Sequence, residues 1–234
     1  MATISDLTTE VRIALNMNKV DEGLEGIGDE ETLKLDELIA SKIADGVRYV
    51  CRHAPLSMLN GYVKEPYLEQ NIVLYRGNTV VDGTLKDGET LRGIYTPQNK
   101  ILRVVSFWMT DWDYPVSNFI TPESPEYAKQ FSKYGVKGNP ERPVAALINN
   151  DTTYSGSQIP YIKIEFFTSG SRNADVYVIP DFSVEQGGKV IPNLEGDAYK
   201  MAVSYIAYLT ALSLGDDSMA GRMLAQYSSL SSEE

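Results

Sequence analysis

The sequence predicts an α+β protein in which helices from both ends of the chain form a bundle and an antiparallel β-rich unit is inserted between them. Near both termini, apolar residues recur at three- and four-residue steps, the spacing of one helix face. Between residues 67 and 180, short apolar runs alternate with turn dipeptides, as in β-hairpins. We therefore expect N-terminal helices over residues 1–66, a β-rich region over 67–192 and a C-terminal helical hairpin over 193–234.

Two helices are expected before residue 55. Ser5 and Asp6 are suitable cap residues, and they precede a first apolar row of Leu7, Val11, Ala14 and Leu15. A flexible acidic loop is expected over residues 21–31. A second apolar row then predicts another helix, which should end before Pro55, because the residue before a proline disfavours helical geometry. This row consists of Leu35, Leu38, Ile39, Ile43, Val47 and Val50.

The central region predicts strands over residues 72–75, 79–81, 91–95, 101–107, 162–166 and 174–179. In the fifth of these, Ile162, Ile164 and Phe166 alternate with Lys163 and Glu165, which is typical of a half-buried strand. We expect the last strand to pair beside it. A short helix is expected over residues 125–134, because Pro125 suits the first turn of a helix.

Two further helices are expected at the C-terminus. Asp197 can cap the first, Gly215 is suited to end it, and Asp216 or Asp217 can begin the second. The first helix is apolar almost all the way round, which is typical of a helix surrounded by protein. On the second helix we expect one apolar side, which consists of Met219, Met223, Leu224 and Tyr227. After this helix we expect a frayed polar tail over residues 228–234.

The charge balance argues against an electrostatic nucleic-acid binder. The chain carries 32 acidic and 21 basic residues, a net charge of −11, whereas affinity for DNA comes from neutralising phosphates. We expect any DNA to pass this protein without being bound. The sequence also predicts neither a membrane span nor a signal peptide, so we expect the chain to stay in the compartment where it is made.

Few residues suggest chemistry. Cys51 and His53 are the only cysteine and histidine, and positions two apart on a helix point in different directions. A structural zinc site typically needs four such ligands. Asp111-Trp112-Asp113 begins like a calcium loop but lacks its glycine, so we interpret these carboxylates as turn residues. We expect no enzyme activity, metal or cofactor.

Aromatic residues are frequent, and they are enriched at protein interfaces. We expect Trp108 to be a core residue. Trp112 and Tyr114, in a predicted turn, fit the core and an interface equally well.

One succession of motifs resembles a known family. A strand from Lys100 to Met109 is followed by Trp112-Asp113-Tyr114-Pro115-Val116, by Pro125-Glu126-Tyr127, by Gly138-Asn139-Pro140 and by Arg142-Pro143-Val144-Ala145-Ala146. This succession is similar to the neck proteins of tailed phages infecting Bacteroidales, including the crAss-like group. The helices at both ends also fall where that family places them. The usual Pro-Asp-Asp-Phe before the strand is here Pro97-Gln98-Asn99-Lys100, a departure that affects the loop more than the fold.

The resemblance implies a structural role in the virion, in the neck between the capsid portal and the tail, after assembly in the host cytoplasm. It implies a ring of about twelve copies, closed by contacts between two different faces of each subunit. The ring would dock on the portal and other neck or tail rings, extend the DNA channel and offer the tail an attachment surface. Our candidate interface residues are Trp112, Tyr114, Tyr199, Tyr205 and Ile206.

Three alternatives stay open. The chain could be another virion component, such as a stopper, tail-tube or baseplate protein. Its aromatic content and central β region also fit a module that binds a small molecule or a glycan. An enzyme that uses carboxylates is the third, although the sequence suggests no particular reaction.

Overall fold

The computed structural model describes residues 3–16, 29–59, 63–65, 69–82, 89–131, 137–150, 161–182 and 194–232. The chain divides into two compact units, one made of Met1–Gly61 with Phe182–Glu234 and the other of Tyr62–Asp181. We call them the helical unit and the β unit. The sequence-based boundary at 66/67 falls just inside the β unit, and the boundary at 192/193 falls beyond its end.

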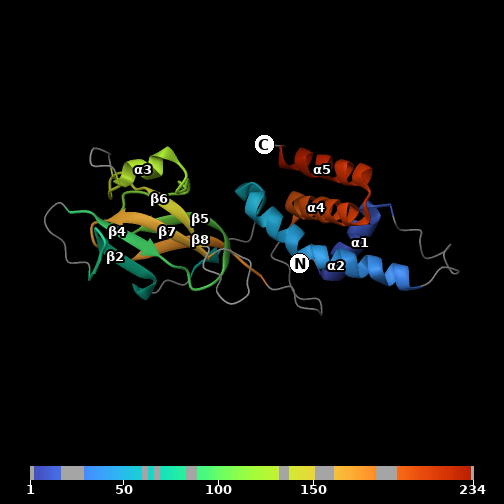
Figure 1. Ribbon diagram of the computed structural model, residues 1–234, viewed down its shortest axis with the longest axis horizontal. Coiled ribbons are helices and arrows are strands. Elements are labelled where there is room, and N and C mark those ends of the chain that lie inside the picture. Colours follow the sequence, from blue (N-terminus) through green and yellow to red (C-terminus); the bar gives the residue numbers. More distant parts are fainter. Residues whose placement is uncertain are drawn as a thin grey trace. The chain divides into compact units, whose positions relative to one another are not determined.

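The predicted α+β class is confirmed (Figure 1). The helices of the helical unit are α1 (Ile4–Ala14), α2 (Asp29–His53), α4 (Gly196–Leu214) and α5 (Asp217–Ser231). Helix α4 contacts the other three, and Figure 1 shows it between α2 and α5. The finer expectation, that the terminal helices form a bundle, stays a prediction.

Helix α1 begins earlier than the sequence suggested. Its N-cap is Thr3, whose hydroxyl accepts a hydrogen bond from the Asp6 amide while the Asp6 carboxylate accepts one from the Thr3 amide. This reciprocal capping box satisfies two amide groups that would otherwise lack partners. The hydrogen bond of Asp6 to the Thr3 backbone also lowers the pKa of its carboxyl group. Leu7 and Val11 of the first apolar row are buried.

Helix α2 begins at Asp29, inside the stretch expected to be an acidic loop; residues 17–28 of that region lie outside the described part of the chain. The apolar row behaves as predicted, because Ile39, Ile43 and Val47 are fully buried. The helix ends at His53, before Pro55, also as predicted.

The α4–α5 connection follows the capping signals in the sequence. Gly215 ends α4 in the left-handed conformation, with φ 77°, and the Asp216 carboxylate caps α5 through the Met219 amide. At the start of α4 the prediction was wrong. The N-cap is Glu195 without a side-chain hydrogen bond, and Asp197 pairs instead with Lys200 at 2.9 Å.

Helix α5 differs from its prediction in two respects. Met219, Met223 and Tyr227 are buried as expected, whereas Leu224 is exposed. The helix also continues to Ser231, through most of the tail that was expected to be frayed.

The β unit contains two antiparallel sheets. The five-stranded sheet has the order β3-β2-β4-β7-β6 and the three-stranded sheet the order β1-β8-β5. The strands are β1 (Val63–Lys64), β2 (Ile72–Arg76), β3 (Thr79–Val81), β4 (Leu91–Tyr95), β5 (Ile101–Met109), β6 (Ala145–Asn150), β7 (Tyr161–Thr168) and β8 (Ala174–Pro180). The 3-10 turns Leu56–Met58 and Glu69–Asn71 and helix α3 (Pro125–Phe131) complete the described elements.

The predicted pairing of the last two strands was wrong. Strand β7 pairs with β4 and β6, while β8 pairs with β1 and β5. The chain changes sheets between them at a corner held by Asp111, whose carboxylate accepts hydrogen bonds from the Thr168 hydroxyl at 2.7 Å and the Ser169 amide at 2.6 Å. Asp111 is therefore a turn carboxylate, as interpreted from the sequence.

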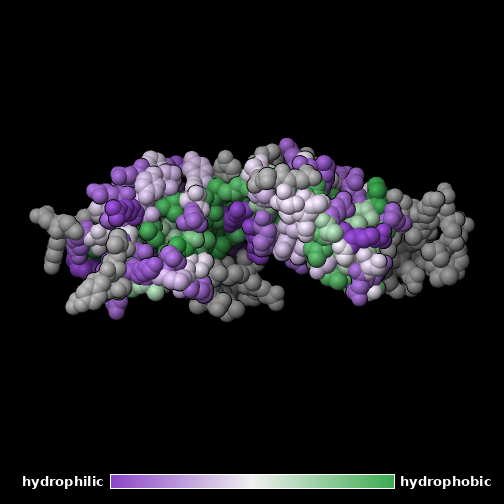
Figure 2. Space-filling model, turned by 90° about the horizontal axis from the view of Figure 1, so that it is seen from above, coloured by the Kyte–Doolittle hydropathy of each residue, from purple (hydrophilic) through white to green (hydrophobic). Residues whose placement is uncertain are grey.

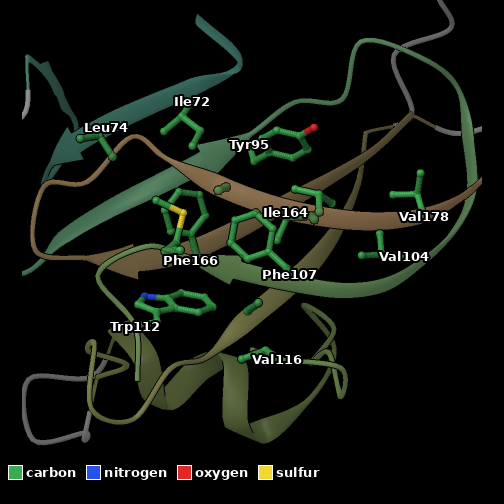
Figure 3. Packing of buried hydrophobic residues seen from close by; sticks show 14 of the residues in the cluster. Ile72, Leu74, Tyr95, Val104, Phe107, Trp112, Val116, Ile164, Phe166 and Val178 are labelled. Atoms are coloured by element: carbon green, nitrogen blue, oxygen red, sulfur yellow. The ribbon is translucent and has the colours of Figure 1, made fainter. Parts of the chain in front are cut away.

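The core of the β unit lies between the two sheets, so the unit is a β-sandwich (Figure 3). Phe166 and Ile164 of the larger sheet face Phe107 and Val178 of the smaller one. The Phe107 and Phe166 ring centroids are 5.0 Å apart.

Candidate interaction surfaces

The outer face of the three-stranded sheet exposes two aromatic side chains. Trp108 of β5 is 38% exposed and Tyr177 of β8 is 37% exposed. In the register of these strands Trp108 lies opposite Asp175, and Ser106 lies opposite Tyr177. Trp108 and Tyr177 are thus diagonal neighbours on one face, a spacing across which aromatic side chains can interact. We call them the aromatic face.

Two further groups border the aromatic face. Lys64, opposite Tyr177 on β1, forms an ion pair with Asp175 at 2.6 Å, and this hydrogen bond raises the pKa of Lys64. The Trp108 indole N–H donates to the Trp112 carbonyl at 2.9 Å. The indole is therefore held at the surface by the turn that follows β5.

The structure corrects the assignment of Trp108 and decides between the two alternatives left open for Trp112. Trp108, predicted in the core, is partly exposed, whereas Trp112, a candidate interface residue, is only 3% exposed. Strand alternation explains the first, because Phe107 points into the core and its neighbour must point out. The turn after β5 folds back and inserts Trp112 into the sandwich, where its N–H donates to the Phe167 carbonyl at 2.8 Å.

Tyr114 is 49% exposed, so its side chain is available at the surface. The turn that carries it is anchored on both sides. The Asp113 amide donates to the Pro140 carbonyl at 3.1 Å, and Val116 exchanges two backbone hydrogen bonds with Phe107. Its role in an interface stays a prediction.

Ile206 cannot contact another chain, because its side chain is fully buried within the helical unit. A methyl group built on Gly46 of α2 would lie 2.4 Å from Ile206 Cγ1. The glycine therefore provides the space into which Ile206 packs. The expectation that α4 is buried here is confirmed, and the assignment of Ile206 to an interface is corrected.

Tyr205 takes part in an aromatic cluster that joins three helices. Its ring stacks on Tyr49 of α2, with centroids 3.9 Å apart and planes at 4°, and lies 5.3 Å from Tyr227 of α5. Burial is the main cause that raises the pKa of Tyr205 to about 12, and the neighbouring tyrosines act in the same direction. The ring thus packs within the chain and is half-buried there.

Tyr199 lies near the start of α4 and is also half-buried. Burial raises its pKa, and the nearby carboxylates Glu10 and Asp6 of α1 act in the same direction. Its position against α1 shows that much of its surface is used inside the helical unit.

The last turn of α4 exposes two leucines that were not among the candidate interface residues. Leu212 is 44% exposed and Leu214 is 46% exposed, just before the Gly215 cap. The expectation that this helix is surrounded by protein therefore fails at its C-terminal end. We call these two residues the α4 end.

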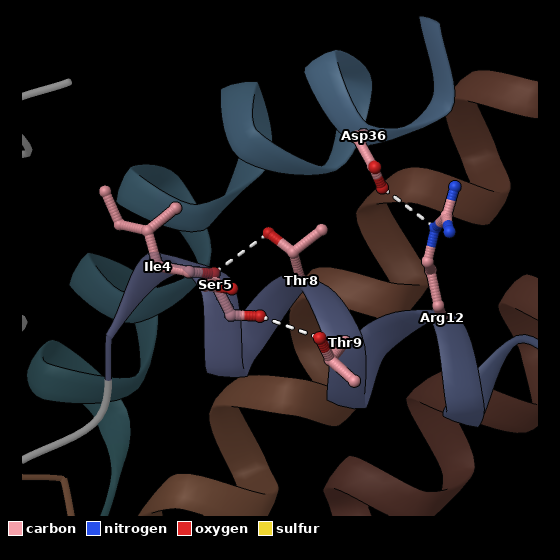
Figure 4. Close-up of polar contacts among 6 residues, drawn as sticks. All are labelled: Ile4, Ser5, Thr8, Thr9, Arg12 and Asp36. Carbon is pink, nitrogen blue, oxygen red and sulfur yellow. Dashed lines mark hydrogen bonds and ion pairs between the residues drawn. The ribbon is translucent and has the colours of Figure 1, made fainter. Parts of the chain in front are cut away.

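An open groove of about 420 Å³ lies between α1 and α2. Figure 4 shows polar contacts within the chain that involve residues lining this groove. The Thr8 and Thr9 hydroxyls donate to the carbonyls of Ile4 and Ser5 at 2.9 Å, and Arg12 pairs with Asp36 at 2.8 Å. These contacts explain the groove as a helix–helix packing feature.

Helix α3 is attached to the outer face of the larger sheet by a buried polar cluster. The Tyr127 hydroxyl donates to Glu165 Oε2 at 2.7 Å, and Glu165, which is 3% exposed, also pairs with Arg92. The Arg92 guanidinium lies over the ring of Phe131 at 5.7 Å. Burial and the hydrogen bond to Glu165 raise the pKa of Tyr127 to about 12.

Within the described ranges, no three His, Cys, Asp or Glu residues gather in a way that could hold a metal ion. Cys51 is buried, whereas His53 is exposed and stacks on Tyr49 with centroids 4.1 Å apart. In the same part of the chain no helix is long and apolar enough to cross a bilayer.

In the view of Figure 2, hydrophobic residues gather in one broad area of the β unit and in smaller areas of the helical unit.

Comparison with known proteins adds no relative: neither the family models nor the curated proteins give a match to this chain.

Proposed function

We propose that this protein is a structural subunit of a phage neck ring, which docks on the portal, extends the DNA channel and provides the attachment surface for the tail. The observation that carries this proposal is the presence of exposed apolar residues on both units. Trp108 and Tyr177 form the aromatic face of the β unit, and Leu212 and Leu214 form the α4 end of the helical unit. A cyclic ring needs two different contact faces on each subunit.

The distribution of charge supports a place beside DNA without binding to it. The helical unit has 18 acidic and 9 basic residues, a net charge of −9; the β unit has 14 and 12, a net charge of −2; together they give −11. Carboxylates repel phosphate groups, so the acidic helical unit is suited to line a channel through which the genome slides.

Several of the residues that carry the family resemblance are core residues. Phe107, Trp112 and Val116 all belong to the buried cluster between the two sheets. The resemblance thus rests in part on positions that specify the fold of the β unit, and we extend it to position and copy number in the virion as part of the proposal.

The test is the copy number of this protein in purified virions, measured by quantitative mass spectrometry against the capsid protein. About twelve copies per particle would support a neck ring. Several dozen or more would indicate a tail tube or another repeated component, and absence from the particle would refute the proposal.

A second measurement separates a portal adaptor from a stopper, tail-tube or baseplate protein. An adaptor binds purified portal directly, whereas the others bind the adaptor or polymerise.

A pair of variants tests the aromatic face in assembly. Tyr177→Ala changes this face, and the matched control is Val80→Ala, at a residue of edge strand β3 that is 60% exposed. We expect the first to reduce assembly into particles and the second to leave it unchanged.

The exposed aromatic face also suits stacking against a sugar ring, which keeps a glycan-binding module as the second candidate. That function predicts a rise in the melting temperature of the monomer with an oligosaccharide, abolished by Tyr177→Ala. The ring function predicts no such rise.

A further inference from the structure

We propose that helix α3 is a hinged cover, which opens away from the outer face of the larger sheet while the rest of the β unit stays folded. This motion belongs to the β unit alone and does not depend on the proposed ring function. Figure 1 shows α3 beside β6, the edge strand of that sheet.

Helix α3 buries almost no apolar surface of its own. Gln130 is its only buried residue and Tyr127 is half-buried, whereas the others are exposed. Even the ring of Phe131 is 48% exposed. The buried side chain of Gln130 is used for a polar contact, because its Oε1 accepts a hydrogen bond from the Gly138 amide at 2.7 Å. Segments with few buried apolar contacts are the ones that open locally in native proteins.

The polar cluster beneath α3 fixes its position without holding it strongly. Tyr127 donates to Glu165, which pairs with Arg92. A buried ion pair adds little net stability, because the loss of hydration offsets the attraction. Both charged residues belong to neighbouring strands, β7 and β4, so their pair stays intact and regains water when α3 lifts. Arg92 then loses its contact with Phe131 but keeps the one with Tyr75 of β2, at 5.6 Å.

The chain on either side of α3 is anchored separately, so the helix can move between two fixed points. Before α3, the Ile120 amide donates to the Ala145 carbonyl at 3.1 Å, and the Ile120 carbonyl accepts from the Leu147 amide at 2.9 Å. After α3, Asn139 and Arg142 exchange two backbone hydrogen bonds, at 3.2 and 3.1 Å. Opening of α3 breaks neither pair of bonds.

Opening would uncover a defined patch of the sheet. Ala146 is 4% exposed and Phe167 is 7% exposed, and both line a cavity of about 10 Å³ beneath α3. Atoms beside a cavity lack contacts on that side, which weakens the attachment of the helix. Ala145, the neighbour of Ala146 on β6, is 1% exposed and belongs instead to the core between the sheets. The two alanines therefore report on opposite faces of one strand.

Thiol labelling distinguishes opening of α3 from unfolding of the β unit. Ala146→Cys and Ala145→Cys are each treated with a maleimide, and peptide mass spectrometry separates the new site from Cys51, which is 2% exposed in the helical unit. We expect position 146 to react about a hundredfold faster than position 145, because local opening costs less free energy than unfolding of the unit. Overpacking at position 145 would raise its rate and so cannot produce this difference. Equal rates would overturn the proposal.

Tyr127→Phe tests whether the hydrogen bond to Glu165 acts as the latch. This change keeps the ring and removes the hydroxyl, so the closed state loses a hydrogen bond to a charged group, and labelling at position 146 should rise about tenfold. Labelling at position 145 should not change. The matched control is Tyr114→Phe in the same unit, at a side chain that is 49% exposed, and it should change neither rate. An equal rise at both positions, or no rise at position 146, would contradict the latch.

Urea dependence gives an independent readout that holds even if a variant is less stable. Opening of α3 exposes little surface, so labelling at position 146 should be nearly constant at low urea concentrations and rise only when global unfolding becomes faster. Labelling at position 145 should rise steeply from the lowest urea concentration. The same steep rise at position 146 would show that α3 leaves the sheet only when the whole unit unfolds, and the cover would be refuted.

Discussion

Gly93 shows how one residue sets the packing of the β unit. It lies opposite Phe166 across β4 and β7, and a methyl group on Gly93 would lie 2.3 Å from Phe166 Cζ. The Phe166 ring therefore occupies the space above a glycine and reaches Phe107 of the other sheet. A side chain at position 93 would displace the ring at the centre of the sandwich.

Gly93→Ala is accordingly expected to destabilise the β unit by about 1 to 3 kcal/mol, the usual cost of overpacking a core. Chemical denaturation followed by aromatic fluorescence measures this change. Gly221→Ala, on α5 where an added methyl group meets nothing within 4 Å, is the control and should not destabilise the protein. Equal stability of Gly93→Ala and the wild type would contradict the packing described for Phe166.

Tyr205 predicts a loss of stability in alkali. Burial in the tyrosine cluster raises its pKa from 10.0 to about 12, so the folded state holds this proton more tightly than the unfolded state does. The resulting stabilisation is complete below pH 10 and is lost as the pH rises from about 10 to about 12. Denaturation measured across this range should show a smaller decrease for Tyr205→Phe than for the wild type, and an identical decrease would contradict the assignment.

Residue-scale prediction from the sequence was reliable for apolar periodicity and poor for turns. The positions Ile39, Ile43, Ile164 and Phe166 follow regular spacing and are buried as expected. Trp108 was wrongly expected in the core and Trp112 was left open, because the sequence does not reveal that the turn after the strand folds inward.

At the scale of elements, the packing of α2 against α4 depends on one complementary pair. Gly46 of α2 receives Ile206 of α4, whose Cγ1 would be 2.4 Å from an added Cβ. The tyrosine stack between Tyr49 and Tyr205 lies in the same helix pair. A larger residue at position 46 would therefore separate the helices and disturb the stack.

Gly46→Ala should lower the free energy of unfolding by about 1 to 3 kcal/mol, because the methyl group clashes with Ile206 even though alanine is the better helix former. Ile206→Ala should also destabilise, by about 2 to 5 kcal/mol, through the cavity that it leaves. In the double variant the methyl group enters that cavity, so the combined loss should be smaller than the sum. Additive effects in this double-mutant cycle would show that the two residues do not touch.

Elements were predictable where local signals decide them, and strand partners were not. Gly215 and Pro55 mark helix ends that the structure confirms. The separation of β7 from β8 depends on Asp111, which comes from a turn more than fifty residues earlier in the chain. Hydrogen bonds over such distances leave no local pattern in the sequence. The same applies to the attachment of α3 through Tyr127 and Glu165.

At the scale of the whole molecule, the two units have separate cores. Ile206 belongs to the helical unit, while the cluster around Phe107 and Phe166 lies entirely in the β unit. Damage to one core should therefore leave the other largely intact. The candidate surfaces also became visible only at this scale, because exposure of Trp108, Tyr177 and Leu212 depends on what the rest of the fold leaves uncovered.

Ile206→Asp is expected to unfold the helical unit, because it buries an unpaired charge at a cost of several kcal/mol, about 3 or more. Hydrogen exchange measured by mass spectrometry should then show lost protection in α2 and α4 and retained protection in β5 and β7. Leu212→Asp, at an exposed position of the same helix, should retain protection in both units. Full protection of α4 in Ile206→Asp would contradict the burial of this residue.

The insertion of one unit into the other has a consequence for the order of biosynthesis. The β unit ends at Asp181, whereas α4, the helix that contacts all the others of the helical unit, begins only at Gly196. During synthesis the sandwich can complete its core while α1 and α2 still lack the helix on which they pack. We therefore expect the β unit to fold before the helical unit, whose two chain segments must both be made before its core can form.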